Sequence, residues 1–161
     1  MINFKLIGND DKERLMYFYN KAYSWDRDKK CFLGEKEKLS DIIKFDNYIM
    51  QEGNSPIGFA STSSIENNIK TYTTVRDKFI PKVEVPLKEI AELCTIIHPD
   101  YRGFGYGTKL IEFLLEVTKF KYSSAIAYIL IENKTSISLC KGRGFKYRCT
   151  NNGENYYEKR L

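Results

Sequence analysis

The sequence lacks most of the features that mark membrane, secreted or metal-binding proteins. Its longest apolar runs are only a few residues, which is too short for a membrane-spanning helix. The first residues, Met-Ile-Asn-Phe-Lys-Leu, do not have the basic and then apolar layout of a signal peptide. The cysteines lie far apart without a CxxC pair and histidine occurs once, so neither a disulfide framework nor a zinc site is indicated. We therefore expect a cytoplasmic protein with no membrane partner and no metal.

The chain also lacks any block of positive charge. Its 26 Lys and Arg residues are spread among 21 Asp and Glu residues, which gives a formal net charge of +5. This excess suits an anionic partner, such as a phosphorylated cofactor, an acidic substrate or nucleic acid, without choosing among them. We do not expect a nucleic-acid partner, because that hypothesis rests on net charge alone.

Apolar and aromatic residues are abundant enough to form a core. Hydrophobic residues make up 42% of the 161 positions and aromatic residues 14%, which argues against a disordered chain. A single core usually holds roughly 100 to 200 residues. We expect one globular domain over residues 1–161, without internal repeats or a linker.

Hydrophobic spacing predicts alternating strands and helices in the first half. A short strand is expected at residues 4–7, followed by a helix capped by Asp10 or Asp11. A further short helix is suggested at residues 39–44. Strands at residues 48–51 and 57–62 flank a turn-rich spacer, which is typical of an antiparallel hairpin.

The second half gives stronger patterns, with one exception. Residues 66–88 lose any period and contain Pro81 and Pro86, so we expect a long excursion there, a candidate lid or substrate wall with room for a short helix or strand. Strands are expected at residues 89–98, 125–131, 145–149 and 156–159. Helices are expected at residues 109–119 and 135–141.

A glycine-rich loop at residues 102–108 joins the strand at residues 89–98 to the following helix. Gly103, Gly105 and Gly107 carry no side chains, so backbone amides can approach a ligand at the start of the helix. Unpaired N–H groups and the helix dipole both favour an anion there, and a pyrophosphate is the natural occupant, with Arg102 adding a formal charge. The alternative is that the glycines only make a tight turn.

The spacing within this loop departs from two common nucleotide-binding patterns. The chain has no GxxxxGK[ST] motif, and its glycines follow G-x-G-x-G instead of G-x-G-x-x-G. No fitting acidic residue follows about 20 positions later. Nucleotide hydrolysis and dinucleotide binding are therefore not indicated.

The residues around this loop resemble the central motif of a known family. The stretch reads Glu92-Leu93-x-x-Ile96-Ile97-His98-Pro99-x-Tyr101-Arg102-Gly103-Phe104-Gly105-Tyr106-Gly107. It is similar to the central motif of the GNAT superfamily of acyl-CoA-dependent N-acyltransferases. The later Asn133, the short helix and the run Lys141-Gly142-Arg143-Gly144-Phe145 resemble that family's closing motif. The likeness is strong over about residues 90–147 and leaves residues 24–45 and 66–88 unexplained.

The resemblance implies an α/β (α+β) GNAT-like fold and a coenzyme A site. The fold would have a central mixed, mostly antiparallel sheet flanked by helices and splayed at the strand that ends near Ile97. Backbone groups of that strand would pair with the pantetheine arm, and the loop amides would hold the pyrophosphate. Asn133 matches a position that often contacts the cofactor, with a helix cap as the alternative. The implied cofactor-binding residues are Thr95, Ile96, Ile97, Arg102, Gly103, Phe104, Gly105, Tyr106, Gly107, Thr108 and Asn133.

Glu92 is the expected general base. An alkyl ammonium cannot attack a thioester until it loses a proton, and a lysine-like amine has a pKa of about 10.4. Glu92 lies seven residues before Pro99, where many members of the family keep a general-base glutamate that acts directly or through a water. The alternative is a solvent-facing or ion-paired strand carboxylate. The oxyanion would be stabilised by a backbone amide near Ile96.

The general acid is left open by a departure from the family pattern. The family keeps a tyrosine five residues before the phenylalanine that corresponds to Phe145, and this chain has Cys140 there. The thiol could protonate the leaving group, be acylated itself, or be a small buried hydrophobe. We assign Cys140 and Tyr147 with Glu92 to the catalytic set, and no spacing rule excludes three other tyrosines, Tyr128, Tyr156 and Tyr157.

Together these residues predict an N-acetyltransferase that transfers an acetyl group from acetyl-CoA directly to an amine in a ternary complex. The acceptor is unspecified, and its recognition is expected in residues 24–45 and 66–88. The alternative, motivated by Cys140, is a CoA-binding module with reduced or no catalysis. A homodimer is compatible with the resemblance, although no surface pattern predicts one.

Overall fold

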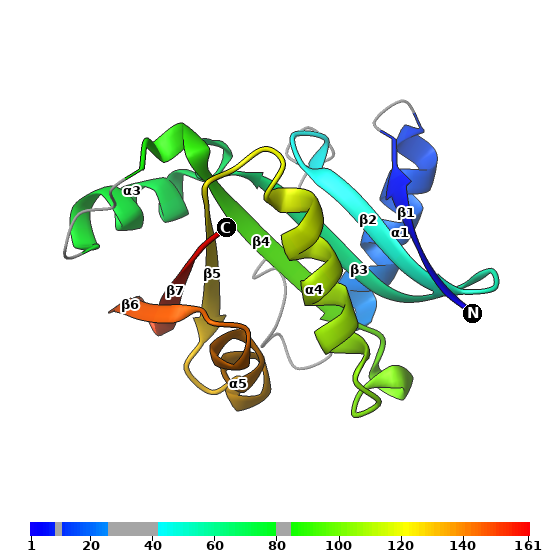
Figure 1. The fold of residues 1–161 in the computed structure, drawn as a ribbon. Helices are drawn as coiled ribbons and strands as arrows, with labels where there is room; N and C mark the ends of the chain where they lie inside the picture. The colour runs from blue at the N-terminus through cyan, green and yellow to red at the C-terminus, as the bar shows by residue number, and fades with distance from the viewer. Residues whose placement is uncertain (9–10, 26–41, 80–84) are drawn as a thin grey trace. The chain divides into compact units, whose positions relative to one another are not determined.

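The computed structural model describes residues 1–8, 11–25, 42–79 and 85–161, coloured in chain order in Figure 1. The strands are β1 (Ile2–Ile7), β2 (Asp46–Glu52), β3 (Ser55–Ser64), β4 (Ile90–Ile97), β5 (Ser124–Leu130), β6 (Lys146–Asn151) and β7 (Glu154–Arg160). The helices in these ranges are α1 (Lys12–Trp25), α3 (Ile69–Lys78), α4 (Tyr106–Thr118) and α5 (Lys134–Gly142). The strands form one sheet in the order β1-β2-β3-β4-β5-β7-β6. This mixed α/β architecture confirms the predicted fold class.

The chain divides into two compact units. Unit 1 contains Met1–Thr62 and Cys94–Leu114, and unit 2 contains Ser63–Leu93 and Leu115–Leu161. The division falls within β4 and within α4, so each of these elements contributes residues to both units.

Local signals in the sequence explain the elements of unit 1. The backbone N–H of Arg14 donates to Oδ1 of Asp11 at 3.0 Å, which confirms one of the two predicted caps of α1. The hairpin of β2 and β3 turns at Gly53, whose φ of 58° favours glycine. Half of the short helix expected at residues 39–44, residues 39–41, lies outside the described residues.

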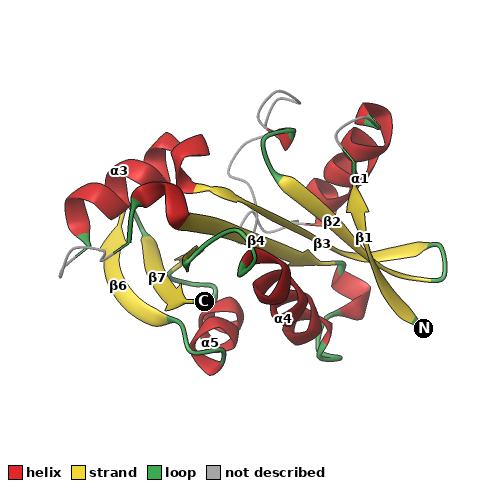
Figure 2. Cartoon of the chain, turned by 45° about the horizontal axis from the view of Figure 1, so that its top comes forward, coloured by secondary structure: helices red, strands yellow, loops and turns green. Residues whose placement is uncertain are grey.

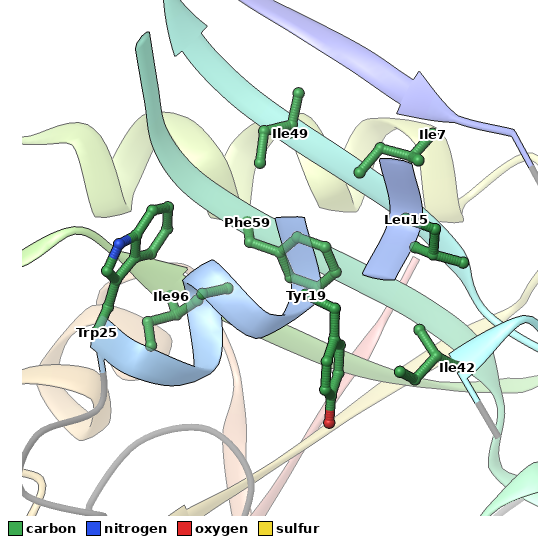
Figure 3. Close-up of a cluster of buried hydrophobic side chains, with 9 residues drawn as sticks. Ile7, Leu15, Tyr19, Trp25, Ile42, Ile49, Phe59 and Ile96 are labelled. Carbon is green, nitrogen blue, oxygen red and sulfur yellow. The ribbon is translucent and has the colours of Figure 1, made fainter. Parts of the chain in front are cut away.

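One face of the β1–β2–β3 sheet packs against α1. The register places Phe59 opposite Ile49, and both belong to a buried cluster that also receives Leu15 and Tyr19 from α1. Figure 3 shows these side chains gathered around the helix. Each buried aliphatic or aromatic side chain of this kind contributes about 1.5 to 3 kcal/mol. The cluster also contains Ile96 of β4, so the strand that leads into the glycine loop is anchored in this core.

The other face of the same strands packs against α4. Tyr48 and Ile49 are neighbours on β2 and therefore project to opposite faces. The ring of Phe113 on α4 lies 5.2 Å from that of Tyr48 and stacks on Phe4 at 4.2 Å between ring centroids. Close packing also requires a glycine, because a Cβ atom on Gly58 would lie 2.9 Å from Cδ1 of Ile97. These contacts fix the first turns of α4 within unit 1.

Unit 2 is built on β5, β7 and β6, with β7 in the middle. The antiparallel register pairs Tyr128 with Tyr156 and Tyr157 with Tyr147. Because Tyr156 and Tyr157 are adjacent, they project to opposite faces of the sheet. Helix α3 covers the Tyr156 face, since Val75 of α3 packs in the same buried cluster as Tyr156. Helix α5 connects β5 to β6 (Figure 2).

None of the helices in the described ranges has the length and hydropathy needed to cross a bilayer.

Candidate functional site

Strand β4 contains the expected general base, Glu92, and residues 95–97, which are expected to pair with the cofactor. Its parallel ladder with β5 pairs Ile90 with Ser124, Ala91 with Ala125 and Glu92 with Ile126. The ladder ends at Glu92, although β4 continues to Ile97. A splayed sheet requires such an early end, because residues 95–97 then keep backbone groups for another partner. Ile96 is buried, whereas Thr95 and Ile97 are partly exposed.

The glycine loop ends in the first turn of α4. Gly103 and Gly105 have φ values of 86° and 79°, a region that other residues rarely adopt, so these two positions need glycine for their backbone conformation. The helix begins at Tyr106, three residues before the expected start, and Lys109 N–H bonds to the carbonyl of Gly105 at 3.2 Å. The amide groups of residues 105–108 therefore have no acceptor within the helix. Such a turn favours a bound anion.

Arg102 is held by the protein's own backbone. Its Nε donates to the carbonyl of Ile97 at 3.0 Å, and its Nη2 donates to the carbonyl of Trp25 at 3.1 Å. Trp25 is the last residue of α1, where the helix dipole favours a positive charge. The guanidinium thus ties the end of β4 to the end of α1 within unit 1. These two bonds use two of the five N–H groups of the exposed guanidinium, which keeps its positive charge beside the loop.

The remaining loop side chains are exposed or half-buried. Phe104 is 72% exposed, and Tyr106, Gly107 and Thr108 are partly exposed. His98 accepts a hydrogen bond from Asp100 N–H at 3.2 Å and caps the short turn Pro99–Tyr101. The single histidine is therefore a strand-end residue in this structure.

Glu92 lies beside the start of α3 within unit 2. Oε1 of Glu92 accepts a hydrogen bond from Nδ2 of Asn68 at 3.1 Å. Oε2 is buried and has no hydrogen-bond partner among the described residues, and the same holds for Oγ1 of Thr71. In the described part of the chain, Glu92 is thus held by one hydrogen bond from Asn68, and its second carboxylate oxygen is shielded from solvent.

Burial dominates the ionisation of this carboxyl group. Desolvation raises the pKa of Glu92 above its ordinary value. The polar side chains of Thr71, Asn68 and Tyr128 and the positive charge of Lys70 act in the opposite direction and are weaker. A carboxylate with a raised pKa binds a proton more readily, as a general base must.

Asn68 is a site residue that the sequence analysis missed. Its Oδ1 accepts hydrogen bonds from the N–H groups of Lys70 at 3.1 Å and Thr71 at 3.4 Å, so it is the N-cap of α3. Its Nδ2 holds Glu92. One side chain thus starts α3 and orients the carboxylate. An Asn at a helix start is a recognisable capping signal, but nothing in the sequence links it to a residue 24 positions away.

Comparison with known proteins identifies the family of this chain. The model of the Acetyltransferase (GNAT) family matches residues 12–145, which is most of the chain. The chain belongs to the GNAT acetyltransferase family. No curated protein matches it by sequence.

Solved structures share the GNAT fold at low sequence identity. The GNAT domain of S. lividans PAT superposes with a TM-score of 0.72 at 17% identity, covering 99% of this chain and 90% of that one. The N-acetyltransferase from Staphylococcus aureus Mu50 gives 0.69 at 20% identity, with 99% and 98% covered. The protein yncA from Salmonella typhimurium, solved with its cofactor acetyl-CoA, gives 0.67 at 15% identity, with 99% and 94% covered. These similarities establish the fold.

In this GNAT chain, Cys140 and Tyr147 are not brought together with Glu92. Glu92 pairs with Ile126, and both lie on the face that α3 covers. Cys140 acts electrostatically on Tyr157, whose ring lies 5.9 Å from that of Tyr147, and this is the opposite face. Within unit 2 the sheet therefore separates the expected base from the two expected acids.

The surroundings of Cys140 and Tyr147 also differ from each other. Cys140 is buried, and desolvation raises the pKa of its thiol to about 11, so it is protonated at neutral pH and a poor nucleophile. The hydroxyl of Tyr147 is bonded to Oγ1 of Thr150 at 2.9 Å, and its side chain is 53% exposed. Of the other tyrosines, Tyr128 and Tyr156 lie on the Glu92 face, and burial raises the pKa of Tyr156 to about 12.

Asn133 has the capping role that was one of its two alternatives. Its Oδ1 accepts a hydrogen bond from Ser136 N–H at 3.1 Å, and α5 begins at the next residue, Lys134. The helix therefore starts one or two residues before the predicted Thr135 or Ser136. A contact between Asn133 and the cofactor stays a prediction.

Proposed function

We propose that this GNAT chain is a cytoplasmic N-acetyltransferase that moves the acetyl group of acetyl-CoA to an amine. The observation that carries the proposal is the first turn of α4, where the amides of residues 105–108 have no acceptor within the helix. An anionic cofactor with a pyrophosphate suits this turn. The family match and the acetyl-CoA in the similar yncA structure support the same cofactor.

The strand and loop residues that would hold acetyl-CoA belong to unit 1. The amides of residues 105–108 would bind the pyrophosphate, and the backbone of residues 95–97 would pair with the pantetheine arm. Arg102 would act by fixing the end of β4, because its guanidinium already donates to two carbonyl oxygens. An added Cβ atom at Gly103 or Gly105 would meet nothing within 4 Å, which leaves room for a ligand to approach the backbone, while their positive φ values also fit the alternative of a simple tight turn.

Glu92 would accept the proton that makes the acceptor amine nucleophilic. The neutral amine attacks the carbonyl carbon of the thioester, an N–C bond forms, and the C–S bond breaks to release the thiolate of CoA. The first proton, lost by the ammonium before attack, goes to the carboxylate of Glu92, whose raised pKa suits this task. The second proton, lost by nitrogen as the amide forms, ends on the released CoA thiolate or in solvent. The thiolate leaves readily without an acid, because a thiol pKa is about 8.5.

Calorimetric titration with acetyl-CoA tests the cofactor assignment. We expect the intact protein to bind acetyl-CoA and the Gly105→Val variant to lose most of that affinity, because valine cannot hold a φ of 79° without strain. Gly53→Val is the matched control, since Gly53 also has positive φ and open space but lies in the β2–β3 turn. No binding by the intact protein, or equal loss in both variants, would contradict the assignment.

A CoA-binding module without catalysis is the second candidate. It is favoured by Cys140, whose protonated thiol replaces the family tyrosine and lies on the face opposite Glu92. Release of free CoA with any member of a panel of amines would rule it out. Binding of acetyl-CoA without such release from every amine would favour it.

A further inference from the structure

We infer that Thr71, in the first turn of α3, is a positioning residue for the acyl transfer. Its hydroxyl and Oε2 of Glu92 together hold one water molecule, and this water passes the proton from the acceptor amine to Glu92. The ammonium N–H proton goes to the water oxygen while an O–H proton of the water goes to Oε2, so the amine becomes neutral and the water is regenerated. The inference rests on the proposed function and assigns a role to a helix outside the family motifs.

The inference begins with two buried polar atoms. Oε2 of Glu92 and Oγ1 of Thr71 are shielded from solvent, and neither has a hydrogen-bond partner in the described part of the chain. Thr71 is fully buried. A buried polar group left unpaired costs roughly 1 to 3 kcal/mol, and native proteins satisfy nearly all of them. Two such atoms beside one another indicate a site for a small hydrogen-bonding molecule.

The two atoms are near each other without being bonded. The Thr71 side chain is close enough to the carboxylate to lower the pKa of Glu92, yet it makes no hydrogen bond of ordinary geometry with Oε2. A single water bridges such a gap, donating one proton to each oxygen. Its oxygen then remains available to accept a proton from an amine.

The other oxygen of the Glu92 carboxylate, Oε1, already accepts a hydrogen bond, and this bond fixes the orientation of the carboxylate. Oε1 of Glu92 accepts from Asn68, and Asn68 also binds the N–H of Thr71 at 3.4 Å. The N-cap therefore places the Thr71 backbone and the carboxylate relative to each other. Oε2 is the oxygen left for the water and the substrate.

The charged and titratable groups around Glu92 come from three elements. Lys70 of α3 forms an ion pair with Glu154 at 2.6 Å and lies 5.4 Å from the ring centroid of Tyr128 on β5. Tyr156 on β7 is a further neighbour, and burial raises the pKa of its hydroxyl, with the Glu92 charge acting in the same direction. A replacement of Thr71 by the isosteric valine leaves all of these groups in place, so its effect reports on the hydroxyl.

The first test follows Glu92 directly and needs no acceptor. The side-chain carboxyl carbons of the full-length protein are labelled with ¹³C-glutamate, the Glu92 signal is assigned by its loss in Glu92→Gln, and its pKa is measured by NMR titration. We expect Thr71→Val to raise the pKa of Glu92 and Thr71→Ser to restore it. Thr74→Val is the control, because buried Thr74 lies one turn further along α3 and bonds to the Lys70 carbonyl and to Asn151 instead. An unchanged pKa in Thr71→Val, or an equal change in Thr74→Val, would overturn the inference.

The second test measures turnover with acetyl-CoA and an amine that the intact protein acetylates. We expect Thr71→Val to lower kcat about tenfold with little change in the KM for acetyl-CoA, and the acidic limb of its pH profile to move to higher pH. Thr71→Ser should behave like the intact protein. Turnover in Thr71→Val equal to that of Thr74→Val would overturn the inference. If the intact protein acetylates no amine, the proposed function fails, and the NMR titration alone decides whether Thr71 acts on Glu92.

Discussion

At the scale of single residues, burial of the Glu92 carboxylate disfavours its charged form and so lowers the stability of the folded state at neutral pH. Burial raises its pKa, so the folded state binds a proton more tightly than the unfolded state does. The free energy of unfolding contributed by Glu92 is therefore fully present at pH values below its unfolded pKa and falls as the pH rises through the raised value. A residue that lowers stability at neutral pH is typical of a functional site.

Replacing Glu92 by glutamine should separate stability from activity. The amide keeps the acceptor for Asn68 and places a donor near Thr71, and it removes the buried charge. We expect Glu92→Gln to abolish most turnover while acetyl-CoA affinity is unchanged, and to stabilise the protein by roughly 1 kcal/mol at about pH 8. The gain should shrink at about pH 4, where glutamate is largely protonated in both states. Thermal unfolding at the two pH values measures this, and a less stable variant at pH 8 would contradict it.

At the scale of single elements, the contact between β3 and α4 depends on the absence of one side chain. A Cβ atom on Gly58 would lie 2.9 Å from Cδ1 of Ile97, 3.2 Å from Cδ2 of Leu110 and 3.4 Å from the carbonyl oxygen of Ile96. Two of these atoms end flexible side chains, but Leu110 is fully buried and has little room to move. The contact matters for the site because Leu110 belongs to the helix that presents the glycine loop.

We expect Gly58→Ala to destabilise the protein by about 1 to 3 kcal/mol, the usual cost of overpacking a core. That corresponds to a loss of roughly 2 to 4 °C in Tm for each kcal/mol in a chain of this size. Gly8→Ala is the matched control, because a Cβ atom there meets nothing within 4 Å. Thermal unfolding of both variants checks the prediction. Equal Tm values would contradict it, because the side chains of Ile97 and Leu110 would then have moved aside without loss of stability.

The same scale shows what the sequence could and could not predict. Strand β4 and helix α4 follow clear apolar patterns, and both were predicted within a few residues of their bounds. Helix α3 was not predicted as a specific helix. Two of its buried residues are Thr71 and Thr74, and threonines do not form the apolar stripe that marks an amphipathic helix. The contacts of Thr71 and Asn68 with Glu92 join segments about 20 residues apart, and only the folded chain brings them together. The place of Glu92 on β4 was therefore predictable, while its neighbours Asn68 and Thr71 were not.

At the scale of the whole molecule, two elements belong to both compact units. β4 supplies residues up to Leu93 to unit 2 and residues from Cys94 to unit 1, and α4 is divided after Leu114. Neither unit keeps all of its strand and helix if the other unfolds, since hydrogen bonds continue through each element. This continuity favours the single domain expected from the chain length.

We therefore predict one cooperative unfolding transition. In differential scanning calorimetry the calorimetric and van't Hoff enthalpies should agree, as they do for two-state domains. Gly58→Ala in unit 1 and Asn68→Ala in unit 2 should move the same transition, although they alter different units. Two resolved transitions, each shifted by only one of these variants, would show that the units unfold independently.

The double role of Asn68 limits how freely this enzyme could be re-engineered or could evolve. Residues 66–88 are the expected place for acceptor recognition, and exchanging such segments between homologues is a natural way to change specificity. Here the segment brings its own N-cap, and that cap is also the hydrogen-bond donor to Glu92. A graft that lacks an asparagine at this position would alter proton transfer together with substrate choice. If residues 66–88 recognise the acceptor and Glu92 is the base, as proposed, both functions share the side chain of Asn68.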